Sequence, residues 1–392
     1  MTSEVPLIIH ISATPVVSAS RLFREAKAAG TGGMSVQALG LSDSGSGETE
    51  SQPSGLQIER VHIRTRALPK ELPFQLLKFT EWSLRILVKL VIRRPNIIHC
   101  HSLSTLLVGV LGKWISGSRL LYDAHELETE RNGLYGTRQK LARQLERRLI
   151  WFADHTIVVG PRIMSWYKKE YPGLQVSCVR NVPEIRCADS STKNTGFDIR
   201  TAISASEEDI VLLYLGGLTP GRGIEFLCKT FSSIPDDLSK YHIVFIGYGP
   251  QISYIEDCAA GSRNIHYFPA VAPEEVVATA GSADIGICLL SSTALSYRYA
   301  LPNKLFEYVS AGIPVIVNDD YPEIADFVAQ FNCGWRIPLS NQALQGLMLK
   351  LTPKNIRNAK SGAAEAAIKN RWQTEATTLM RIYDDLIGRR MV

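Results

Sequence analysis

Short apolar runs alternate with helix-like segments along the whole chain, and this alternation constrains the fold more than any other feature. The runs that we expect to form buried strands are 7–11, 97–101, 119–123, 155–159, 176–180, 210–215, 242–246, 265–271, 283–290 and 315–317. The first of them, Leu7–Ile11, is followed by a loop and then by a helical pattern over 21–29. Repeated strand–loop–helix units are typical of parallel sheets covered by helices. The sequence therefore predicts an α/β fold.

The chain length predicts more than one domain. With 392 residues, the chain is too long for a single ordinary core, so we expect two domains. The composition turns polar over 184–209, which we interpret as the connection between them. We place the first domain at 1–183 and the second at 184–371. The last segment, 372–392, begins a helix whose apolar residues recur at helical spacing, so it packs against another element.

Composition and charge exclude several classes of protein. The net charge of +5 is mild, and basic residues do not cluster with aromatic ones, so we expect no nucleic-acid partner. The seven cysteines form no Cys-x-x-Cys pair, which favours reduced thiols over disulfides. Residues 1–7 carry no basic flank and no long apolar stretch, so no signal peptide is evident. We expect a cytoplasmic protein.

A long helix is predicted over 74–94. Charged residues recur every three or four positions along one side of it, at Lys78, Glu81, Arg85, Lys89 and Arg93. Such a helix cannot span a bilayer. It could lie on a membrane surface, as a peripheral contact with the inner face of the membrane, or it could cover the sheet with its charged stripe in water. We favour the second interpretation.

Two histidine motifs follow predicted strands. His99-Cys100-His101 looks like a metal cluster, but no further ligand set has the expected spacing, so we expect no metal. His125-Glu126 comes just after the strand 119–123, where the loops of an open α/β sheet form the ligand crevice. This pair could act in acid/base or orienting work, or it could be a helix cap with a surface histidine.

The stretch from Ser296 to Asn318 reads as a loop, a helix and a strand. Pro302 suits the first turn of the helix, and Gly312 suits its left-handed cap. Free backbone N–H groups around Leu301, Asn303 and Lys304, together with the Lys304 charge, would bind an anion. Glu307, one turn on, could accept hydrogen bonds from ribose hydroxyls. The stretch is therefore either a nucleotide site or a capped core helix with a solvated Lys and Glu.

Glycine-rich loops follow two strands of the second half. Residues 216–223, which begin with Gly216 and Gly217, would let a ligand approach backbone N–H groups, with Arg222 available for phosphate. Gly247 and Gly249 follow the strand 242–246. The backbone near Val271, at the end of the strand 265–271, could face a base. The loops lack the Rossmann and Walker spacings, so a nicotinamide dehydrogenase is not expected.

These residues together resemble the retaining glycosyltransferases of family 4. The matching pieces are Tyr214-Leu215-Gly216-Gly217-Leu218, Gly221-Arg222-Gly223, Gly247-Tyr248-Gly249-Pro250, the stretch from Leu301 to Pro314, Ile97 to His101, Tyr122 to Glu126 and Arg180-Asn181-Val182-Pro183. The resemblance implies the GT-B fold, in which two Rossmann-like domains face each other across a cleft. Residues 1–183 would bind the acceptor and 184–371 the nucleotide-sugar donor, and the helix in 372–392 would cross back to the first domain.

The resemblance also implies an activity and a set of site residues. The chain would be a hexosyltransferase-type enzyme that moves a sugar, with retention, from a nucleotide sugar to a glycan or lipid-linked acceptor in polysaccharide or glycolipid biosynthesis. The residues with a catalytic role would be His125, Arg222 and Lys304. The donor would contact Gly216, Gly217, Arg222, Gly247, Gly249, Val271, Leu301, Asn303, Lys304 and Glu307. The diphosphate would be held without a divalent metal or other cofactor.

Two departures from the family pattern leave alternatives open. Tyr299 stands where the family usually has a sugar-binding glutamate, and Gly217 stands where it commonly has an arginine. Lys304 could supply the lost positive charge. The alternatives are a nucleotide-sugar epimerase and a catalytically silent GT-B partner subunit that binds nucleotide.

Overall fold

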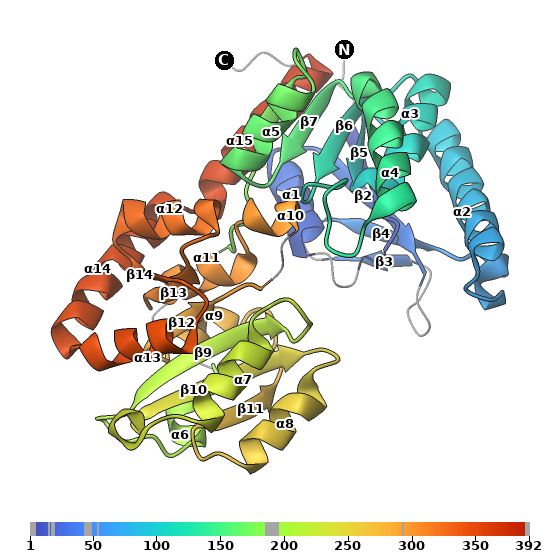
Figure 1. Cartoon of the computed structure of the whole chain (residues 1–392). Coiled ribbons are helices and arrows are strands. Elements are labelled where there is room, and N and C mark those ends of the chain that lie inside the picture. Colours follow the sequence, from blue (N-terminus) through green and yellow to red (C-terminus); the bar gives the residue numbers. More distant parts are fainter. Residues whose placement is uncertain are drawn as a thin grey trace. The chain divides into compact units, whose positions relative to one another are not determined.

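The computed structural model describes residues 5–14, 16, 20–42, 49–52, 55–184, 196–291 and 294–388. The chain divides into two compact units, an N-terminal unit of residues 1–180 with 373–392 and a C-terminal unit of residues 181–372 (Figure 1). Each unit is a largely parallel sheet with helices on its faces, as the strand–helix alternation predicts. Of the polar connection expected at 184–209, residues 185–195 lie outside the described part of the chain.

The N-terminal unit is built on an eight-stranded sheet. Its strands are β1 (Leu7–Ile11), β2 (Ser35–Leu41), β3 (Thr49–Ser51), β4 (Gln57–Val61), β5 (Ile97–His101), β6 (Arg119–Ala124), β7 (His155–Val158) and β8 (Val176–Cys178). They lie in the order β3-β4-β2-β1-β5-β6-β7-β8, and all pairs are parallel except β3 with β4. Strand order reverses between β1 and β5, so the carboxyl ends of these two strands mark the ligand crevice expected of an open α/β sheet.

Helices cover this sheet, and the last of them comes from the end of the chain. They are α1 (Ser20–Thr31), α2 (Leu72–Arg93), α3 (Leu103–Ser116), α4 (Gly136–Leu149), α5 (Pro161–Glu170) and α15 (Trp372–Ile387), with the 3-10 turns η2 (Arg64–Ala67) and η3 (Ile150–Phe152). Glu375 of α15 accepts hydrogen bonds from Arg180, and the Tyr383 hydroxyl lies 2.8 Å from Nδ1 of His99. The expectation that the final helix crosses back to the first domain is confirmed.

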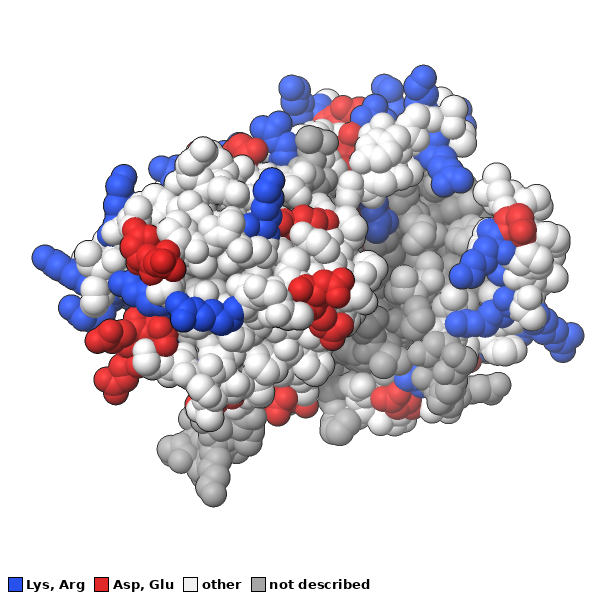
Figure 2. Space-filling view, turned by 60° about the horizontal axis from the view of Figure 1, so that its bottom comes forward, with Lys and Arg blue, Asp and Glu red and all other residues white. Residues whose placement is uncertain are grey.

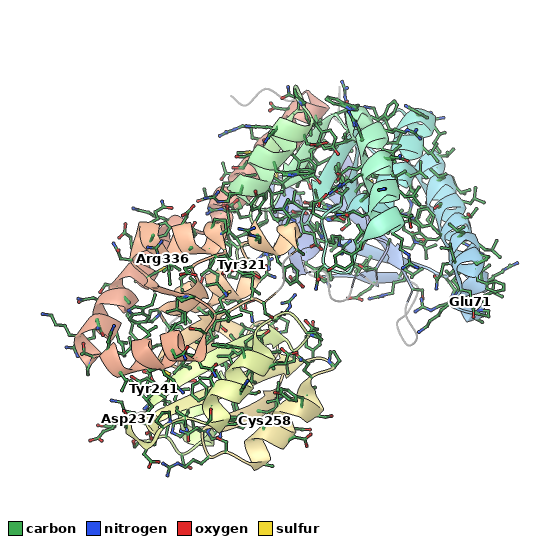
Figure 3. All side chains as sticks on the ribbon, viewed as in Figure 1. Glu71, Asp237, Tyr241, Cys258, Tyr321 and Arg336 are labelled. Carbon is green, nitrogen blue, oxygen red and sulfur yellow. The ribbon has the colours of Figure 1, made fainter. Side chains whose placement is uncertain are left out.

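The C-terminal unit has a six-stranded parallel sheet. Its strands are β9 (Ile210–Gly217), β10 (Tyr241–Tyr248), β11 (Ile265–Pro269), β12 (Ile285–Cys288), β13 (Val315–Asn318) and β14 (Gly334–Ile337), in the order β11-β10-β9-β12-β13-β14. Its helices are α6 (Ile199–Ala202), α7 (Ile224–Ser232), α8 (Ile252–Ala260), α9 (Val276–Ala280), α10 (Leu295–Arg298), α11 (Asn303–Ser310), α12 (Pro322–Phe331), α13 (Asn341–Lys350) and α14 (Pro353–Lys369), with the turn η4 (Asp236–Leu238). Tyr241, labelled in Figure 3, ties β10 to α13 through a hydrogen bond from its hydroxyl to the Met348 carbonyl.

The orientation of α2 differs from the interpretation that we favoured. The charged stripe does not lie free in water, because it faces η2 and the edge of the sheet. Glu81 accepts hydrogen bonds from the N–H groups of Arg64 and Thr65, each at 2.9 Å, and Lys89 and Arg93 both pair with Glu59 of β4. The stripe consists of long side chains with fixed partners across the domain, which periodicity along one helix cannot show.

Several element boundaries also differ from the expectations. The expected strand 265–271 ends at Pro269, so Val271 lies in the loop beyond β11. The segment before α11 is not only a loop, since α10 occupies Leu295–Arg298. Pro302 lies just before the first turn of α11, in extended conformation. Gly312 has a φ of 73°, which confirms its role as the left-handed cap.

The surface carries charges of both signs. On the face drawn in Figure 2, Lys and Arg side chains are interspersed with Asp and Glu, and broad areas between them carry neither. Within the described ranges, no helix is both long and apolar enough to cross a bilayer.

Candidate functional site

Two glycine-rich loops of the C-terminal unit meet at the carboxyl end of β9. A Cβ atom on Gly247 would lie 1.9 Å from the carbonyl oxygen of Gly216, so only glycine lets β10 approach β9 at this point. The N–H of Leu218 donates to the carbonyl of Tyr248 at 2.8 Å. Gly249 has a φ of 152° and packs against the Leu218 carbonyl. The loops predicted as a ligand site are therefore joined to each other.

The loop after β9 is also tied to the loop after β12. The N–H of Ser291 donates to the carbonyl of Gly221 at 3.0 Å. Strand order reverses between β9 and β12, so this loop pair lies at the switch point of the C-terminal sheet. At Gly217, by contrast, no atom in the described part of the chain, apart from Gly217 and its two chain neighbours, lies within 4 Å of the position that its Cβ would occupy. The arginine that the family pattern places at this position would have open space around it.

Helix α11 is held against the same strand end by Tyr308. Its buried hydroxyl donates to the carbonyl of Leu213 at 2.9 Å and accepts from the N–H of Leu215 at 2.8 Å, both in β9. Pro302, which stands at the N-cap position of α11, makes no side-chain hydrogen bond to the first turn. The contacts of Tyr308 fix the start of the helix, with its first N–H groups and Lys304, relative to the loop that contains Arg222.

Lys304 and Arg222 bring two positive charges to this region. The Lys304 ammonium is buried and lies 3.3 Å from the centre of the Tyr214 ring. Burial, with a further contribution from the charge of Arg222, lowers the pKa of Lys304 to about 7. The Nε atom of Arg222 is buried and has no hydrogen-bond partner within the described ranges. Among the described residues, neither side chain forms an ion pair, so both cations are available to an anion.

The remaining predicted donor residues lie around this region. Glu307 is half-buried one turn after Asn303, and Asn303 is exposed, with its Oδ1 accepting from Asn181 at 2.7 Å. Leu301 is a core residue. Val271 is half-buried and packs against the same core from its loop, and Tyr299 ends α10. The structure thus brings together the Gly216 and Gly247 loops, Arg222 and Lys304. Val271 lies in the loop after β11 and not at the end of a strand, where it was expected.

In the N-terminal unit, His125 belongs to a buried network around Asp123. Its Nε2 lies 3.1 Å from Oδ2 of Asp123 and 2.9 Å from Nδ1 of His101. Burial by itself lowers the pKa of His125, but the Asp123 carboxylate outweighs it, so the net pKa is raised. The His125 side chain is 36% exposed, so part of it is accessible to a ligand. This arrangement favours the orienting or acid/base interpretation of His125 over a solvated surface residue.

The sequence did not reveal the residues beneath His125. His101 lies 2.9 Å from His10, and Arg21 forms a two-point hydrogen bond with Asp123 at 2.8 and 3.0 Å. Arg21 also lies 3.0 Å from the buried Glu25. Two features of the sequence could have pointed to this network. They are a histidine within the apolar first strand, His10, and two charged residues four positions apart on the first helix, Arg21 and Glu25. The strand order that brings them to Asp123 is not visible in the sequence.

The network contains the ligand types of a metal site. The ligand atoms of His10, Glu25, His99 and His101 all lie within 4.8 Å of one another. The sequence argument that no further ligands accompany the two strand histidines is therefore wrong, because the additional ones come from β1 and α1. The Arg21 guanidinium already supplies a positive charge to Glu25 and Asp123, and their charges keep the pKa of Arg21 raised despite its burial. A buried ion network with an internal cation is the simpler account of this cluster.

Comparison with known proteins identifies both units. Residues 13–171 match the family described as a glycosyl transferase 4-like domain, and residues 197–362 match the family described as glycosyl transferases group 1. A stretch of 95 residues is 28% identical to the lipopolysaccharide 1,2-N-acetylglucosaminetransferase of Salmonella typhimurium and covers 24% of each chain. A stretch of 177 residues is 25% identical to an uncharacterized glycosyltransferase of Methanocaldococcus jannaschii and covers 41% of this chain and 42% of that protein. These matches span less than half the length of either relative.

Solved structures of similar fold superimpose on nearly the whole chain. Sucrose-phosphate synthase from Thermosynechococcus elongatus superimposes with a TM-score of 0.79 at 15% identity, over 98% of this chain and 100% of that one. HepE from Anabaena, in complex with UDP and glucose, superimposes with a TM-score of 0.72 at 12% identity, over 97% of this chain and 100% of that one. At these identities the likeness establishes the fold.

Proposed function

This chain belongs to the glycosyltransferases of the GT-B fold, and we propose that it transfers a sugar, with retention at the anomeric carbon, from a nucleotide sugar to a glycan or lipid-linked acceptor. The observation that carries the proposal is the pair of cations, Arg222 and Lys304, beside the first turn of α11. An anion with two charged groups, such as a diphosphate, would interact with both cations and with backbone N–H groups at the start of α11. The structure of Anabaena HepE in complex with UDP-glucose, which has a similar fold, supports this choice of donor.

The cations would act most strongly as the donor bond breaks. In the transition state the sugar becomes oxocarbenium-like and the departing diphosphate gains negative charge. Arg222 and Lys304 would stabilise that charge from positions that are fixed before the reaction begins. We propose that they fill the role that a divalent ion fills in other transferases. The expected result is that a chelator such as EDTA leaves the transfer rate unchanged, and a loss of rate that Mg²⁺ restores would refute this part of the proposal.

His125 and Glu307 would position the donor and the sugar. Glu307 would accept hydrogen bonds from the ribose hydroxyls, one helical turn from the diphosphate. His125 would donate a hydrogen bond to the transferred sugar or orient the acceptor, with its imidazole held by Asp123. We further propose that the protein works in the cytoplasm, which fits the six described cysteines, all of which are free thiols.

A thermal-shift panel of nucleotides and nucleotide sugars tests the donor site. Ligands that bind the folded state raise the melting temperature by mass action. We expect one of the UDP, GDP or ADP donors to do so, and Glu307→Ala to remove most of the shift without lowering the melting temperature of the free protein. Glu365→Ala, which removes an exposed carboxylate from α14, is the matched control. No shift with any donor, or equal shifts for Glu307→Ala and the parent, would contradict the proposal.

The open space at Gly217 favours a second candidate. The arginine that is missing there, together with Tyr299 in place of a glutamate, fits a partner subunit that binds nucleotide but transfers no sugar. Purified protein that binds a nucleotide sugar, yet neither hydrolyses nor transfers it with any acceptor, would establish this alternative.

A further inference from the structure

A row of apolar side chains covers the outward side of α2. We call it the outer face of α2 and define it by residues that are 43–75% exposed, namely Leu76, Leu77, Leu84, Val88, Val91 and Ile92. Thr80 is the exposed polar residue among them. Scattered exposed leucines are normal on a protein surface, but a contiguous apolar helix face is typical of a binding site.

The rest of α2 holds this face outward. On one side, Trp82, Ile86 and Leu90 are buried, and the helix packs against α3. On the other side, the charged stripe is fixed to η2 and β4, since Lys78 donates to the Leu68 carbonyl at 2.7 Å and Arg93 pairs with Glu59. Rotation of the helix to bury its leucines would break the contacts on both sides. The exposure of the outer face is thus imposed by the fold.

Basic residues flank the outer face. Arg64 and Arg66 of η2 and Lys70 in the following loop are exposed beside the first turns of α2, and Arg94 is exposed at its end. Glu71, labelled in Figure 3 at the start of the helix, is an exposed acid in the same region. The carboxylate of Glu81 is occupied by η2 and Arg85. The face is therefore apolar along its centre and positively charged around its start.

We propose that the outer face of α2, together with η2, binds the surface of a bilayer that contains anionic lipids. A helix of this type lies in the interfacial plane with its apolar side among the acyl chains, while nearby cations meet anionic headgroups. A protein partner would cover the leucines equally well, but it would give no reason for the surrounding arginines. η2 follows the carboxyl end of β4 and His125 follows the carboxyl end of β6, so both lie at the carboxyl edge of the parallel strands. A lipid-linked acceptor would reach that edge from the membrane.

Sedimentation of the full chain with lipid vesicles tests the proposal. Vesicles of phosphatidylcholine alone are compared with vesicles that contain about one-third phosphatidylglycerol, each at low and at high salt. We expect strong binding to the anionic vesicles at low salt and weaker binding in the other conditions. Leu77→Gln with Leu84→Gln should lower the partition coefficient about 100-fold. Arg64→Gln with Arg66→Gln should lower it roughly 10- to 30-fold at low salt.

Matched controls keep the result interpretable. Leu349→Gln removes a leucine of α13 that is 60% exposed in the C-terminal unit, and it should leave vesicle binding unchanged. Circular dichroism and the melting temperature check that each variant is folded. The assay contains no nucleotide or sugar, so its outcome does not depend on the proposed transfer reaction.

Three results would overturn the proposal. They are equal binding to neutral and anionic vesicles, unchanged binding of the Leu77→Gln/Leu84→Gln variant, and no binding of the parent to any vesicle. A different outcome would show that a second copy covers the face. In that case the parent would be dimeric by analytical ultracentrifugation and would not bind vesicles, whereas the leucine variant would be monomeric.

Discussion

Lys304 leads to a specific prediction about the pH dependence of donor binding. In the free protein its pKa is about 7, because burial disfavours the ammonium form and Arg222 adds repulsion. A bound diphosphate would place negative charge beside the amine and raise its pKa again. Binding would therefore require a proton that the free protein loses as the pH rises through 7, whereas below that pH the amine is already charged.

The magnitude follows from the charged fraction of the amine. With a pKa of about 7, about 90% of the Lys304 amines carry a proton at about pH 6, and about 10% do so at about pH 8. If only the charged form binds the donor tightly, the dissociation constant should rise about tenfold over this range, which corresponds to ~1.4 kcal/mol. Above neutral pH, binding should also take up close to one proton.

Isothermal titration calorimetry measures both quantities. The ligand should be the nucleotide sugar that gives the largest thermal shift, because its diphosphate stays fully ionised over this pH range. Repeating the titration in buffers with different ionisation enthalpies gives the proton uptake. Lys304→Arg keeps its charge at all these pH values, so its affinity should not change with pH. Lys304→Met should bind weakly at both ends of the range and take up no proton.

A flat pH profile for the parent would refute this reasoning. If the parent and the Lys304→Met variant share the same affinity and the same proton uptake, Lys304 does not contact the donor, and Arg222 alone would have to hold it. If Lys304→Arg retains the pH dependence of the parent, another group is the source of the titration.

Two further predictions concern buried charges of the N-terminal unit. Asp123→Asn should lower the free energy of unfolding, measured in urea, by about 3–5 kcal/mol, because Arg21 loses its main partner. Adding Arg21→Met to the same chain should recover part of this loss. An Asp123→Asn variant as stable as the parent would contradict the buried network. Glu146 accepts hydrogen bonds from three buried tyrosine hydroxyls, and burial raises its pKa from 4.5 to about 7. Neutral Glu146 should therefore stabilise the fold below about pH 4.5, and this contribution of up to ~3 kcal/mol should be lost as the pH rises through 7. In the same urea titrations, the free energy of unfolding of Glu146→Gln should fall less over this pH range.

The central strands and the glycine-rich loops could be predicted because the patterns that identify them lie within short segments of the sequence. A run such as Leu7–Ile11 is buried, so all of its residues except His10, which joins the polar network, are apolar. Some strands at or near the edges of the sheets escaped prediction, among them β4 and β14. The burial of β4 alternates along Gln57–Val61, and β14 is partly exposed, so both contain polar residues that weaken the pattern.

Local sequence patterns were sufficient to predict the α/β alternation, the glycine loops after β9 and β10, and the helix from Asn303 to its cap at Gly312. Each of these depends on the residue types within one short segment, through apolar runs, backbone conformation or capping. The side of α2 that faces solvent could not be predicted in this way, because the partners of its charged stripe lie in η2 and β4.

The tertiary structure also decided the chemistry of the two candidate sites. Lys304 reads as a solvated first-turn lysine in the sequence, but the ring of Tyr214 and the surrounding core bury it and lower its pKa. His125 reads as one histidine after a strand, whereas strand order places Asp123, His101 and Arg21 beneath it. Burial and long-range charge pairing depend on distances between segments that are far apart in the chain, and a linear pattern does not contain those distances.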